Sequence, residues 1–216
     1  MFVGKRMTRN LITVDRKTSI LKARNLLREH NIDQLPVVDG KKLVGIITDS
    51  DIRENSASPA TTLSIHELNY LLSQMKVEDV MTKSVFTVTP GTPIEEAALI
   101  INEKRVNSLP VVAGDELVGI ITTCDLLYVL VDFMGVGMPS SRIEMKLSSN
   151  MGEIGKVAGI VNSKGRTILS IISTIDRKSP DSRTTLIRVD TENPEELCRE
   201  LETAGYQCAS EYRIIK

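Results

Sequence analysis

The stretch Leu43-Val44-Gly45-Ile46-Ile47-Thr48-Asp49-Ser50-Asp51 decides the fold of this chain, because its pattern Leu-Val-Gly-Ile-Ile-Thr-x-x-Asp occurs again at residues 117–125. The two copies are offset by 74 residues, from residue 43 to residue 117. The same offset relates Leu35-Pro36-Val37-Val38 to residues 109–112. Such a repeat is considered before any other signal. Two copies are too few for a solenoid, so we expect them to pack face to face as one unit, with clefts where they meet.

Each copy carries the same order of secondary-structure signals. A β-rich run comes first, at residues 11–14 and 85–88, and is followed by apolar residues at helical spacing. Two short strands joined by a tight turn come next, and in the first copy the turn is Asp39-Gly40, a strong hairpin signal. A second helix then begins at Thr48 or at Thr122. The sequence therefore predicts a β-α-β-β-α unit that is present twice.

The repeat also predicts the domain boundaries. We assign residues 1–76 to the first repeat with a connecting helix, and residues 77–134 to the second repeat. A linker is expected at 135–141, where glycine, proline and serine gather, and a separate module at 142–216. The connecting helix should open at Ser64-Ile65-His66-Glu67, which has the form of a capping box.

The C-terminal module does not continue the repeat. Its patterns predict strands at 143–147, 167–175, 184–190 and 208–214, with helices at 152–162 and 194–205. The order β-α-β-β-α-β is that of the ferredoxin-like split βαβ fold. The fold class expected for the whole chain is therefore α/β in the broad sense (α+β).

Composition excludes several classes of protein. The 216 residues include 27 Lys and Arg against 28 Asp and Glu, so there is no basic excess for sequence-independent binding of nucleic acid. No apolar stretch approaches the roughly 20 residues of a membrane helix, and the N-terminus lacks the apolar segment of a signal peptide. The three cysteines are scattered and form no CxxC pair, which fits reduced thiols in a cytosol. Together with the two histidines they form no metal-ligand pattern. We expect a cytoplasmic protein without a nucleic-acid, membrane or metal partner.

The repeated Thr-x-x-Asp pattern suggests a chemistry. In each copy a strand runs into a helix N-terminus, where unpaired N–H groups and the helix dipole favour an anion. The hydroxyl of Thr48 or Thr122 could approach a phosphate, and the carboxylate of Asp51 or Asp125 could accept two hydrogen bonds from a ribose diol. The alternative is structural, because Thr-x-x-Asp is also a variant of the capping box. The two roles are not exclusive.

With these motifs the repeats resemble a tandem pair of CBS domains, a Bateman module, from Met7 to about Leu130. The resemblance implies two clefts related by a pseudo-two-fold axis, which bind AMP, ATP or S-adenosylmethionine. It implies that Asp51 and Asp125 hold ribose hydroxyls and that Thr48 and Thr122 approach phosphate. The adenine pockets would be lined by backbone around Thr13, Ile32, Leu35, Thr87, Val106 and Leu109.

One position suggests that the two clefts differ. Arg53 follows Asp51 and could add positive charge for a phosphate, whereas the counterpart of Arg53 is Leu127, which could not. We therefore expect the clefts to bind charged phosphates with different affinities.

The C-terminal module resembles an ACT domain, a ferredoxin-like module that often binds amino acids at dimer interfaces. The ligand loop of that family would correspond to Asn150-Met151-Gly152, although Gly152 could equally serve the turn itself. Both resemblances imply self-association, and we expect a homodimer. A role of this module in dimerisation is the simpler expectation.

The favoured function is that of a non-enzymatic regulatory protein that senses adenosine nucleotides and signals to an unidentified partner protein. No cofactor is required in this interpretation. The order of modules is similar to that of acetoin-utilisation proteins, which suggests acetoin metabolism as the pathway. The alternative is an amino-acid sensor that works through the ACT-like module. Catalysis is not expected, because the chain has no HExxH, no GxxxxGK[ST] and no Ser-His-Asp set.

Overall fold

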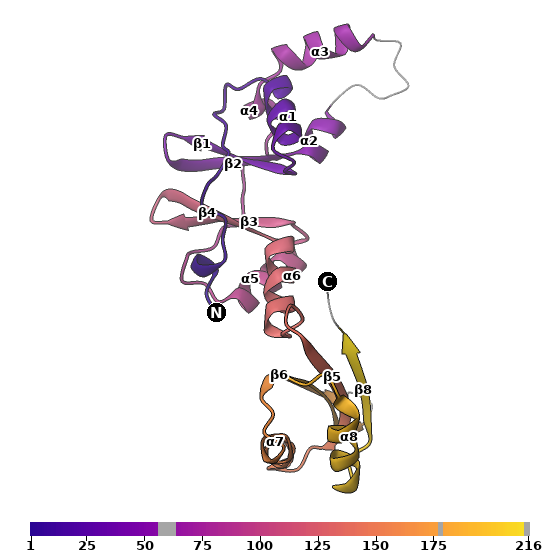
Figure 1. The fold of residues 1–216 in the computed structure, drawn as a ribbon. Helices are drawn as coiled ribbons and strands as arrows, with labels where there is room; N and C mark the ends of the chain where they lie inside the picture. Colours follow the sequence, from indigo (N-terminus) through magenta and orange to yellow (C-terminus); the bar gives the residue numbers. More distant parts are fainter. Residues whose placement is uncertain (56–63, 177–178, 214–216) are drawn as a thin grey trace. The chain divides into compact units, whose positions relative to one another are not determined.

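The computed structural model describes residues 1–55, 64–176 and 179–213 (Figure 1). The chain forms two compact units, Met1–Leu126 and Leu127–Lys216, and each is described by itself. The first unit contains both repeats up to the start of the last helix of the second repeat.

The two repeats have corresponding elements. A 3-10 helix, η1, spans Val3–Lys5. The first repeat continues with α1 (Ile20–Glu29), β1 (Gln34–Asp39), β2 (Lys42–Thr48) and α2 (Asp49–Glu54). Two connecting helices follow, α3 (Ile65–Gln74) and α4 (Val77–Val80). The second repeat has α5 (Ile94–Lys104), β3 (Ser108–Ala113), β4 (Glu116–Thr122) and α6 (Thr123–Phe133).

The predicted first strand of each repeat is much shorter than expected. Residues 11–14 and 85–88 form only single parallel bridges, Val14 with Val37 and Val88 with Val111. The N–H of Val14 donates to the Pro36 carbonyl (3.1 Å), and the Val38 N–H donates to the Val14 carbonyl (2.9 Å). A longer parallel ladder would need the N–H of residue 36, and proline has none. The proline of the repeated Leu-Pro-Val-Val motif therefore stops the strand that the sequence predicts.

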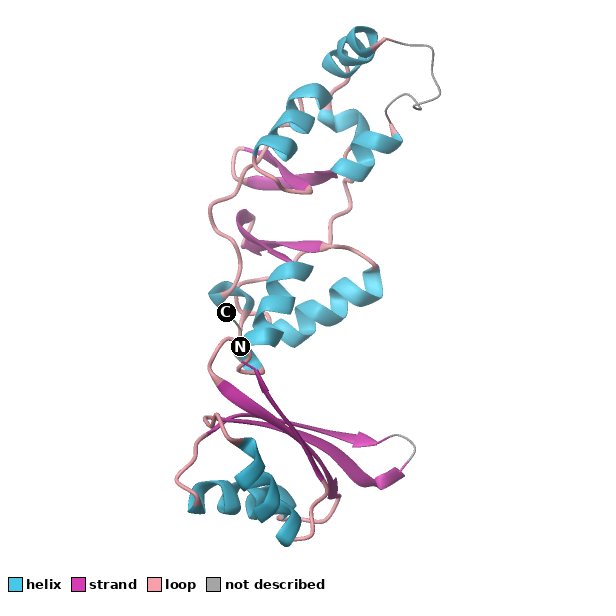
Figure 2. Ribbon diagram, turned by 45° about the vertical axis from the view of Figure 1, so that its right-hand side comes forward, coloured by secondary structure: helices cyan, strands magenta, loops and turns pink. Residues whose placement is uncertain are grey.

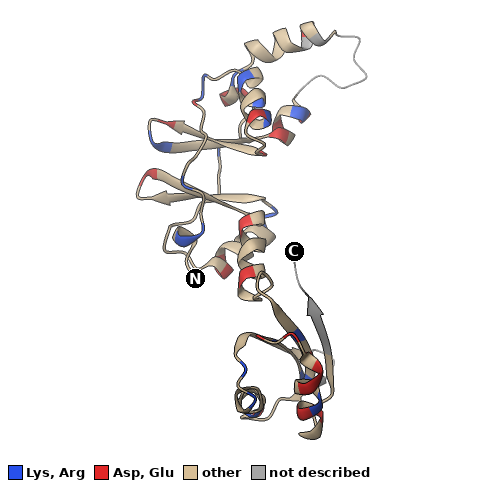
Figure 3. Ribbon diagram, in the orientation of Figure 1, with Lys and Arg blue, Asp and Glu red and all other residues tan. Residues whose placement is uncertain are grey.

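The two hairpins meet in one four-stranded sheet of order β1-β2-β4-β3, and the helices lie beyond them on both sides (Figures 1 and 2). The contact between β2 and β4 pairs Lys42 with Glu116. The hairpin turns carry opposite charges (Figure 3), with ion pairs of 3.3 Å between Lys41 and Glu116 and of 3.7 Å between Lys42 and Asp115. These exposed pairs help to set the register of the hairpins but add little stability.

The segment that opens each repeat crosses to the other repeat. Thr8 forms an antiparallel bridge with Ile120 of β4, and Thr82 forms the same bridge with Ile46 of β2. This crossing explains the glycine of the repeated motif, because a Cβ at Gly119 would lie 2.5 Å from the Met7 sulfur and 3.1 Å from the Thr8 carbonyl oxygen. The two repeats are therefore interlocked through their opening segments.

The core of the first repeat lies between its helices and its hairpin. Ser19 caps α1 by accepting a hydrogen bond from the Lys22 N–H (3.3 Å), and the predicted capping box of Ser64 and Glu67 is present at the start of α3. The spacing of apolar residues along α1 turns one face inward. The core consists of Val14, Ile20, Ala23, Leu27, Leu35, Val37, Ile47, Ile52, Leu72, Val77 and Met81.

The second unit has the predicted β-α-β-β-α-β order. Its elements are β5 (Ser140–Ser148), α7 (Glu153–Ser163), β6 (Ile168–Asp176), β7 (Ser179–Val189), α8 (Pro194–Thr203) and β8 (Cys208–Arg213). The antiparallel sheet has the order β6-β7-β5-β8, which is the ferredoxin-like topology. Strand β5 begins inside the predicted linker 135–141, and Ile214 of the predicted last strand lies outside the described residues.

Helices α7 and α8 cover the same face of the sheet of the second unit (Figure 2). Alternate residues of β5, namely Ile143, Met145 and Leu147, are buried against apolar residues of α7 and α8. Helix α7 begins one residue later than predicted, because Gly152 adopts the left-handed conformation with φ of +86°. None of the helices in the described residues is long and apolar enough to cross a membrane.

Candidate functional site

A cavity of about 430 Å³ lies where the two repeats of the first unit meet, and we call it the first cleft. Three segments and Asn107 line it. The segments are residues 8–12 at the start of the first repeat, residues 31–36 before and within β1, and residues 120–124 at the junction of β4 and α6. Its lining consists of Thr8, Asn10, Leu11, Ile12, Asn31, Ile32, Asp33, Gln34, Pro36, Asn107, Ile120, Thr122, Thr123 and Cys124.

The crossing of the opening segments builds this cleft. The paired N–H and carbonyl groups of Thr8 and Ile120 join the start of the first repeat to β4 of the second (2.9 and 3.0 Å). The Thr-x-x-Asp junction that borders the first cleft is therefore that of the second repeat. A binding site here would combine the walls of one repeat with the helix N-terminus of the other.

The junction at Thr122 has the hydrogen bonds of a capping box. The N–H and the hydroxyl of Thr122 both donate to Asp125 Oδ2, each over 2.8 Å, and the Asp125 N–H donates to the Thr122 hydroxyl oxygen over 3.2 Å. Thr48 and Asp51 repeat this pattern at 2.8, 2.8 and 3.1 Å. The capping alternative is thus what the structure has at both junctions.

Capping leaves one oxygen of each aspartate available. All bonds from Thr48 and Thr122 go to Oδ2, and within the described residues no hydrogen bond reaches Oδ1 of Asp51 or Asp125. Both carboxylates are half-buried. Asp125 follows the lining residue Cys124 by one position in the sequence. Its Oδ1 is the carboxylate oxygen that the cap leaves for a ligand hydroxyl. The threonine hydroxyl, by contrast, already both donates and accepts.

The remaining predicted residues take different places. Ile32 and Thr122 line the first cleft, whereas Leu35 and Leu109 are fully buried, with 0% exposure. Thr13 is half-buried and outside the lining, and Thr87 lines a separate cavity of about 210 Å³. The two leucine side chains belong to the core because alternate residues of β1 and β3 face α1 and α5.

Two further predicted residues are Val106, in the second repeat, and Arg53, in α2. Val106 is half-buried and is the counterpart of Ile32. Arg53 is exposed and forms an ion pair with Asp49 over 3.2 Å, one turn away on the same helix. The prediction that Arg53 adds charge for a phosphate therefore requires this pair to open.

Sequence reasoning missed several residues of the lining. Asn10, Asn31, Asp33 and Cys124 carry polar groups in the first cleft. The first three lie outside the repeated motifs, and Cys124 occupies a variable position of the Thr-x-x-Asp pattern. Asn31 has a positive φ of 50°, as does its counterpart Arg105 with 53°, so both turns have the same backbone. Asparagine often occupies such a turn, but sequence does not reveal that the turn faces the partner repeat.

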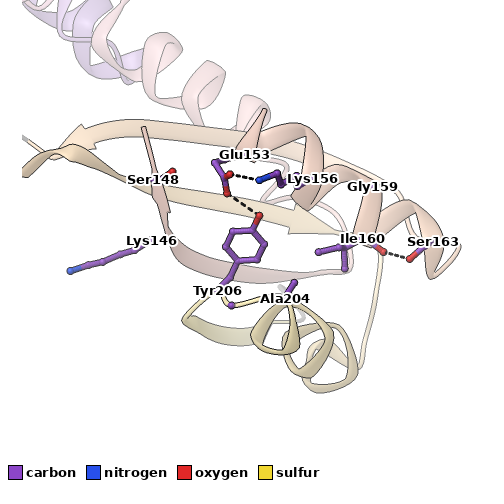
Figure 4. A pocket seen from close by; sticks show the side chains of 10 residues that line it. Lys146, Ser148, Glu153, Lys156, Gly159, Ile160, Ser163, Ala204 and Tyr206 are labelled. Carbon is purple, nitrogen blue, oxygen red and sulfur yellow. Dashed lines mark hydrogen bonds and ion pairs between the residues drawn. The ribbon is translucent and has the colours of Figure 1, made fainter. Parts of the chain in front are cut away.

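The second unit has a larger hollow of about 680 Å³ near the start of α7 (Figure 4). There Tyr206 donates its hydroxyl to Glu153 over 2.9 Å, and the Lys156 ammonium donates to the other carboxylate oxygen over 2.7 Å. These bonds lower the pKa of Glu153, that from Lys156 more than that from Tyr206. The pKa of Tyr206 is raised, first by burial and then by Glu153. In this hollow Glu153, Lys156 and Tyr206 therefore bind one another.

The predicted amino-acid loop lies beside another cavity of the second unit. Asn150 and Gly152 line a space of about 260 Å³ together with Arg183. The Nε atom of Arg183 is buried and has no hydrogen-bond partner in the described part of the chain. Among the described residues, no group of three or more His, Cys, Asp or Glu side chains could hold a metal ion.

Comparison with known proteins identifies a family for the first unit. The sequence model of the CBS domain matches residues 3–58 and 77–132, which together are more than half of the chain. Among curated relatives, the inosine-5′-monophosphate dehydrogenase of Korarchaeum cryptofilum is 37% identical over 123 residues. That match covers 56% of this chain and 22% of the relative, so the chain spans only a fraction of that enzyme's length.

Solved structures are similar to about three fifths of the chain. A Vibrio cholerae protein described as an acetoin utilization protein (AcuB) is 29% identical, with a TM-score of 0.53 over 63% of this chain and 94% of that one. CBSX2 in complex with AMP is 35% identical (TM-score 0.50, 61% and 96% covered). The CBS pair of protein MJ0100, in complex with 5′-methylthioadenosine and S-adenosyl-L-methionine, is 29% identical (TM-score 0.50, 60% and 99% covered).

Proposed function

The chain belongs to the CBS-domain family, and from this premise we propose that it is a regulatory protein that binds an adenosine compound in the first cleft. The proposal rests on one observation above all. The first cleft is an open cavity between the repeats, bordered by a strand-to-helix junction whose aspartate keeps one oxygen available. Its volume of about 430 Å³ lies in the range of small-molecule sites.

The walls of the first cleft suit a nucleoside. Leu11, Ile12, Ile32, Pro36 and Ile120 provide apolar surface for a purine ring. Polar groups lie around these walls, as in most ligand sites, where a few polar groups fix the orientation. In this proposal Asp125 Oδ1 accepts hydrogen bonds from the ribose hydroxyls. Asp51 Oδ1 does the same at the junction of the first repeat.

The proposed mode of action is regulatory and non-enzymatic. A ligand can bias the arrangement of the two repeats only by the difference in its affinity for two states of the protein. A coupling of about 1–3 kcal/mol is typical of such regulation. We include in the proposal a homodimer in the cytoplasm that acts on a partner protein. The likeness to the Vibrio cholerae protein supports acetoin utilisation as the pathway.

The experiment that tests this proposal is a thermal-shift titration of the full chain with AMP, ATP, 5′-methylthioadenosine and S-adenosylmethionine. A ligand at 100 times its Kd should stabilise the protein by about 2.7 kcal/mol. The variant Asp125→Asn should weaken binding about tenfold or more, because a hydrogen bond to a charged group contributes about 1.5–3 kcal/mol.

The matched control is Asp115→Asn at the exposed β3–β4 turn, which should bind as the wild type does. Asparagine can still accept the capping bonds of Thr122 at position 125, so the Asp125→Asn protein should remain folded. The proposal fails if no adenosine compound raises the melting temperature, or if both variants bind equally.

A second candidate function rests on Arg183. Its buried Nε without a partner and its place beside Asn150 and Gly152 suit a carboxylate, which a guanidinium binds through paired hydrogen bonds. In this alternative the second unit is an ACT-like amino-acid sensor and the repeats are a scaffold. A thermal shift with an amino acid that disappears in Arg183→Gln, but persists in Arg166→Gln at an exposed position, would favour it.

A further inference from the structure

Resting on the proposed function, we infer that the first cleft prefers adenosine compounds whose 5′ substituent is neutral or cationic, such as a thioether or a sulfonium, over those that carry phosphates. The observation that carries this inference is the charge of the lining. Asp33 is its one residue charged at neutral pH, and none of the described lining residues is lysine, arginine or histidine. A phosphate in this cleft would meet a carboxylate and no cation.

The helix N-terminus at this cleft does not compensate, because its donors are already used. The Thr122 N–H donates to Asp125, the Thr123 N–H donates to the Asn107 carbonyl over 3.0 Å, and the Asp125 N–H donates to Thr122. The Asp125 carboxylate also places a negative charge at the positive end of α6. Of the first four N–H groups from Thr122, only that of Cys124 has no bond within the described residues.

The arginine nearest in sequence to the lining of the first cleft is Arg9, and its guanidinium is bound elsewhere. Arg9 lies between two lining residues, Thr8 and Asn10, but its guanidinium donates to the Gly4 carbonyl over 2.8 Å. Arg9 would therefore have to break this bond before it could approach a ligand in the first cleft.

The counterpart position across the pseudo-symmetry has the opposite character. Arg105 corresponds to Asn31 at the offset of 74 residues, and both have the left-handed backbone, with φ of 53° and 50°. Because Asn31 lines the first cleft, the repeat predicts that Arg105 lies at the matching position on the side of the Thr48–Asp51 junction. Arg105 is exposed and available to a phosphate. By this symmetry a phosphate would meet a cation only on the Thr48 side of the module.

Cys124 allows occupancy of the first cleft to be measured directly. It lines this cleft and is exposed, whereas its counterpart is Ser50, which has no thiol. Of the other two thiols, Cys198 is buried, and burial raises the pKa of Cys208 to about 11, so both should react slowly at pH 8. Protection of Cys124 from iodoacetamide, followed by mass spectrometry, therefore reports binding in the first cleft alone.

The experiment measures, for AMP, ATP, 5′-methylthioadenosine and S-adenosylmethionine, the concentration at which half of the Cys124 thiols are protected from iodoacetamide. It uses the whole chain of 216 residues. We expect S-adenosylmethionine and 5′-methylthioadenosine to protect at concentrations about tenfold lower than AMP or ATP, equivalent to about 1.4 kcal/mol. Protection by ATP or AMP at equal or lower concentration than the sulfur compounds overturns this inference and leaves the proposed function standing. Protection by none of the four overturns both.

Two variants test the cause of the preference. Asn31→Arg introduces the residue that Arg105 already shows to fit this backbone, and it should lower the protecting concentration of ATP about tenfold without improving that of 5′-methylthioadenosine. Asp33→Asn should weaken protection by S-adenosylmethionine more than protection by the uncharged 5′-methylthioadenosine. An Asn31→Arg protein that is folded by circular dichroism but shows no gain for ATP contradicts the inference.

Discussion

The junctions at Thr48–Asp51 and Thr122–Asp125 have the same hydrogen bonds, with distances that agree within 0.1 Å, yet their surroundings differ. The first cleft, beside Thr122, is lined by Asn31 and Cys124, whereas the matching positions of the other junction are Arg105 and Ser50. The repeated motif thus determines the backbone and its caps. The chemistry offered to a ligand depends on the variable positions of the motif and on residues outside it, which the two repeats do not share.

The largest expected effect on stability concerns the two equivalent core leucines, Leu35 and Leu109. Leu35→Ala and Leu109→Ala should each lower the free energy of unfolding by about 2–5 kcal/mol, and by similar amounts, because both side chains are fully buried in equivalent places. Urea denaturation followed by circular dichroism measures the loss. A cost below about 1 kcal/mol at either position would show that this leucine faces a ligand cleft instead of the core.

The next effect concerns the glycines through which the repeats interlock. A Cβ at Gly45 would lie 2.6 Å from the Met81 sulfur, and one at Gly119 would lie 2.5 Å from the Met7 sulfur. Each Gly→Ala change should therefore cost about 1–3 kcal/mol of stability in the same denaturation experiment.

The matched control for these glycines is Gly159→Ala in helix α7, where a Cβ would meet nothing within 4 Å. Alanine there should be neutral or should stabilise the helix by up to about 1 kcal/mol. If the three variants behave alike, close approach is not the reason for glycine in the repeated motif.

The smallest expected effect on stability comes from a comparison of two thiols, Cys124 in the first unit and Cys208 in the second. Burial, and then the neighbouring Cys198, raises the pKa of Cys208 to about 11, whereas the pKa of a thiol in an unfolded chain is about 8.5. Between these values the unfolded state binds fewer protons than the folded state, so stability is complete below about pH 8.5 and falls as the pH rises towards 11.

The measurement is the urea midpoint at pH 8 and at pH 10. The wild type should lose more stability over this interval than Cys208→Ala, and Cys124→Ser should lose as much as the wild type. An equal loss in Cys208→Ala and in the wild type would show that this thiol is not responsible.

Much of the fold could be predicted because its signals are local. The hairpin turns at Gly40 and Gly114, both with φ of +61°, and the caps at Ser64, Thr48 and Thr122 each depend on residues within a few positions of one another. The same holds for the β-α-β-β-α-β order of the second unit, which confirmed the prediction from its hydrophobic patterns.

The short first strands show where local patterns fail. Residues 11–14 have the composition of a strand, but a parallel ladder depends on the partner strand, and Pro36 offers no N–H. A strand in isolation has no hydrogen bonds of its own, so composition cannot determine how far its ladder extends. The repeated proline limits the length of this ladder, but its effect could be recognised only once Val14 was seen to pair with Val37.

By itself, the sequence determined that the chain contains a repeat at an offset of 74 residues, with a Thr-x-x-Asp pattern in each copy. Only the tertiary structure decided that residues 8–12 cross to β4, and hence that the walls of the first repeat meet the junction of the second. The physical reason is distance along the chain. Helices, turns and caps are made by neighbours in sequence, whereas this cleft joins residues more than one hundred positions apart, whose contact depends on how the two repeats pack.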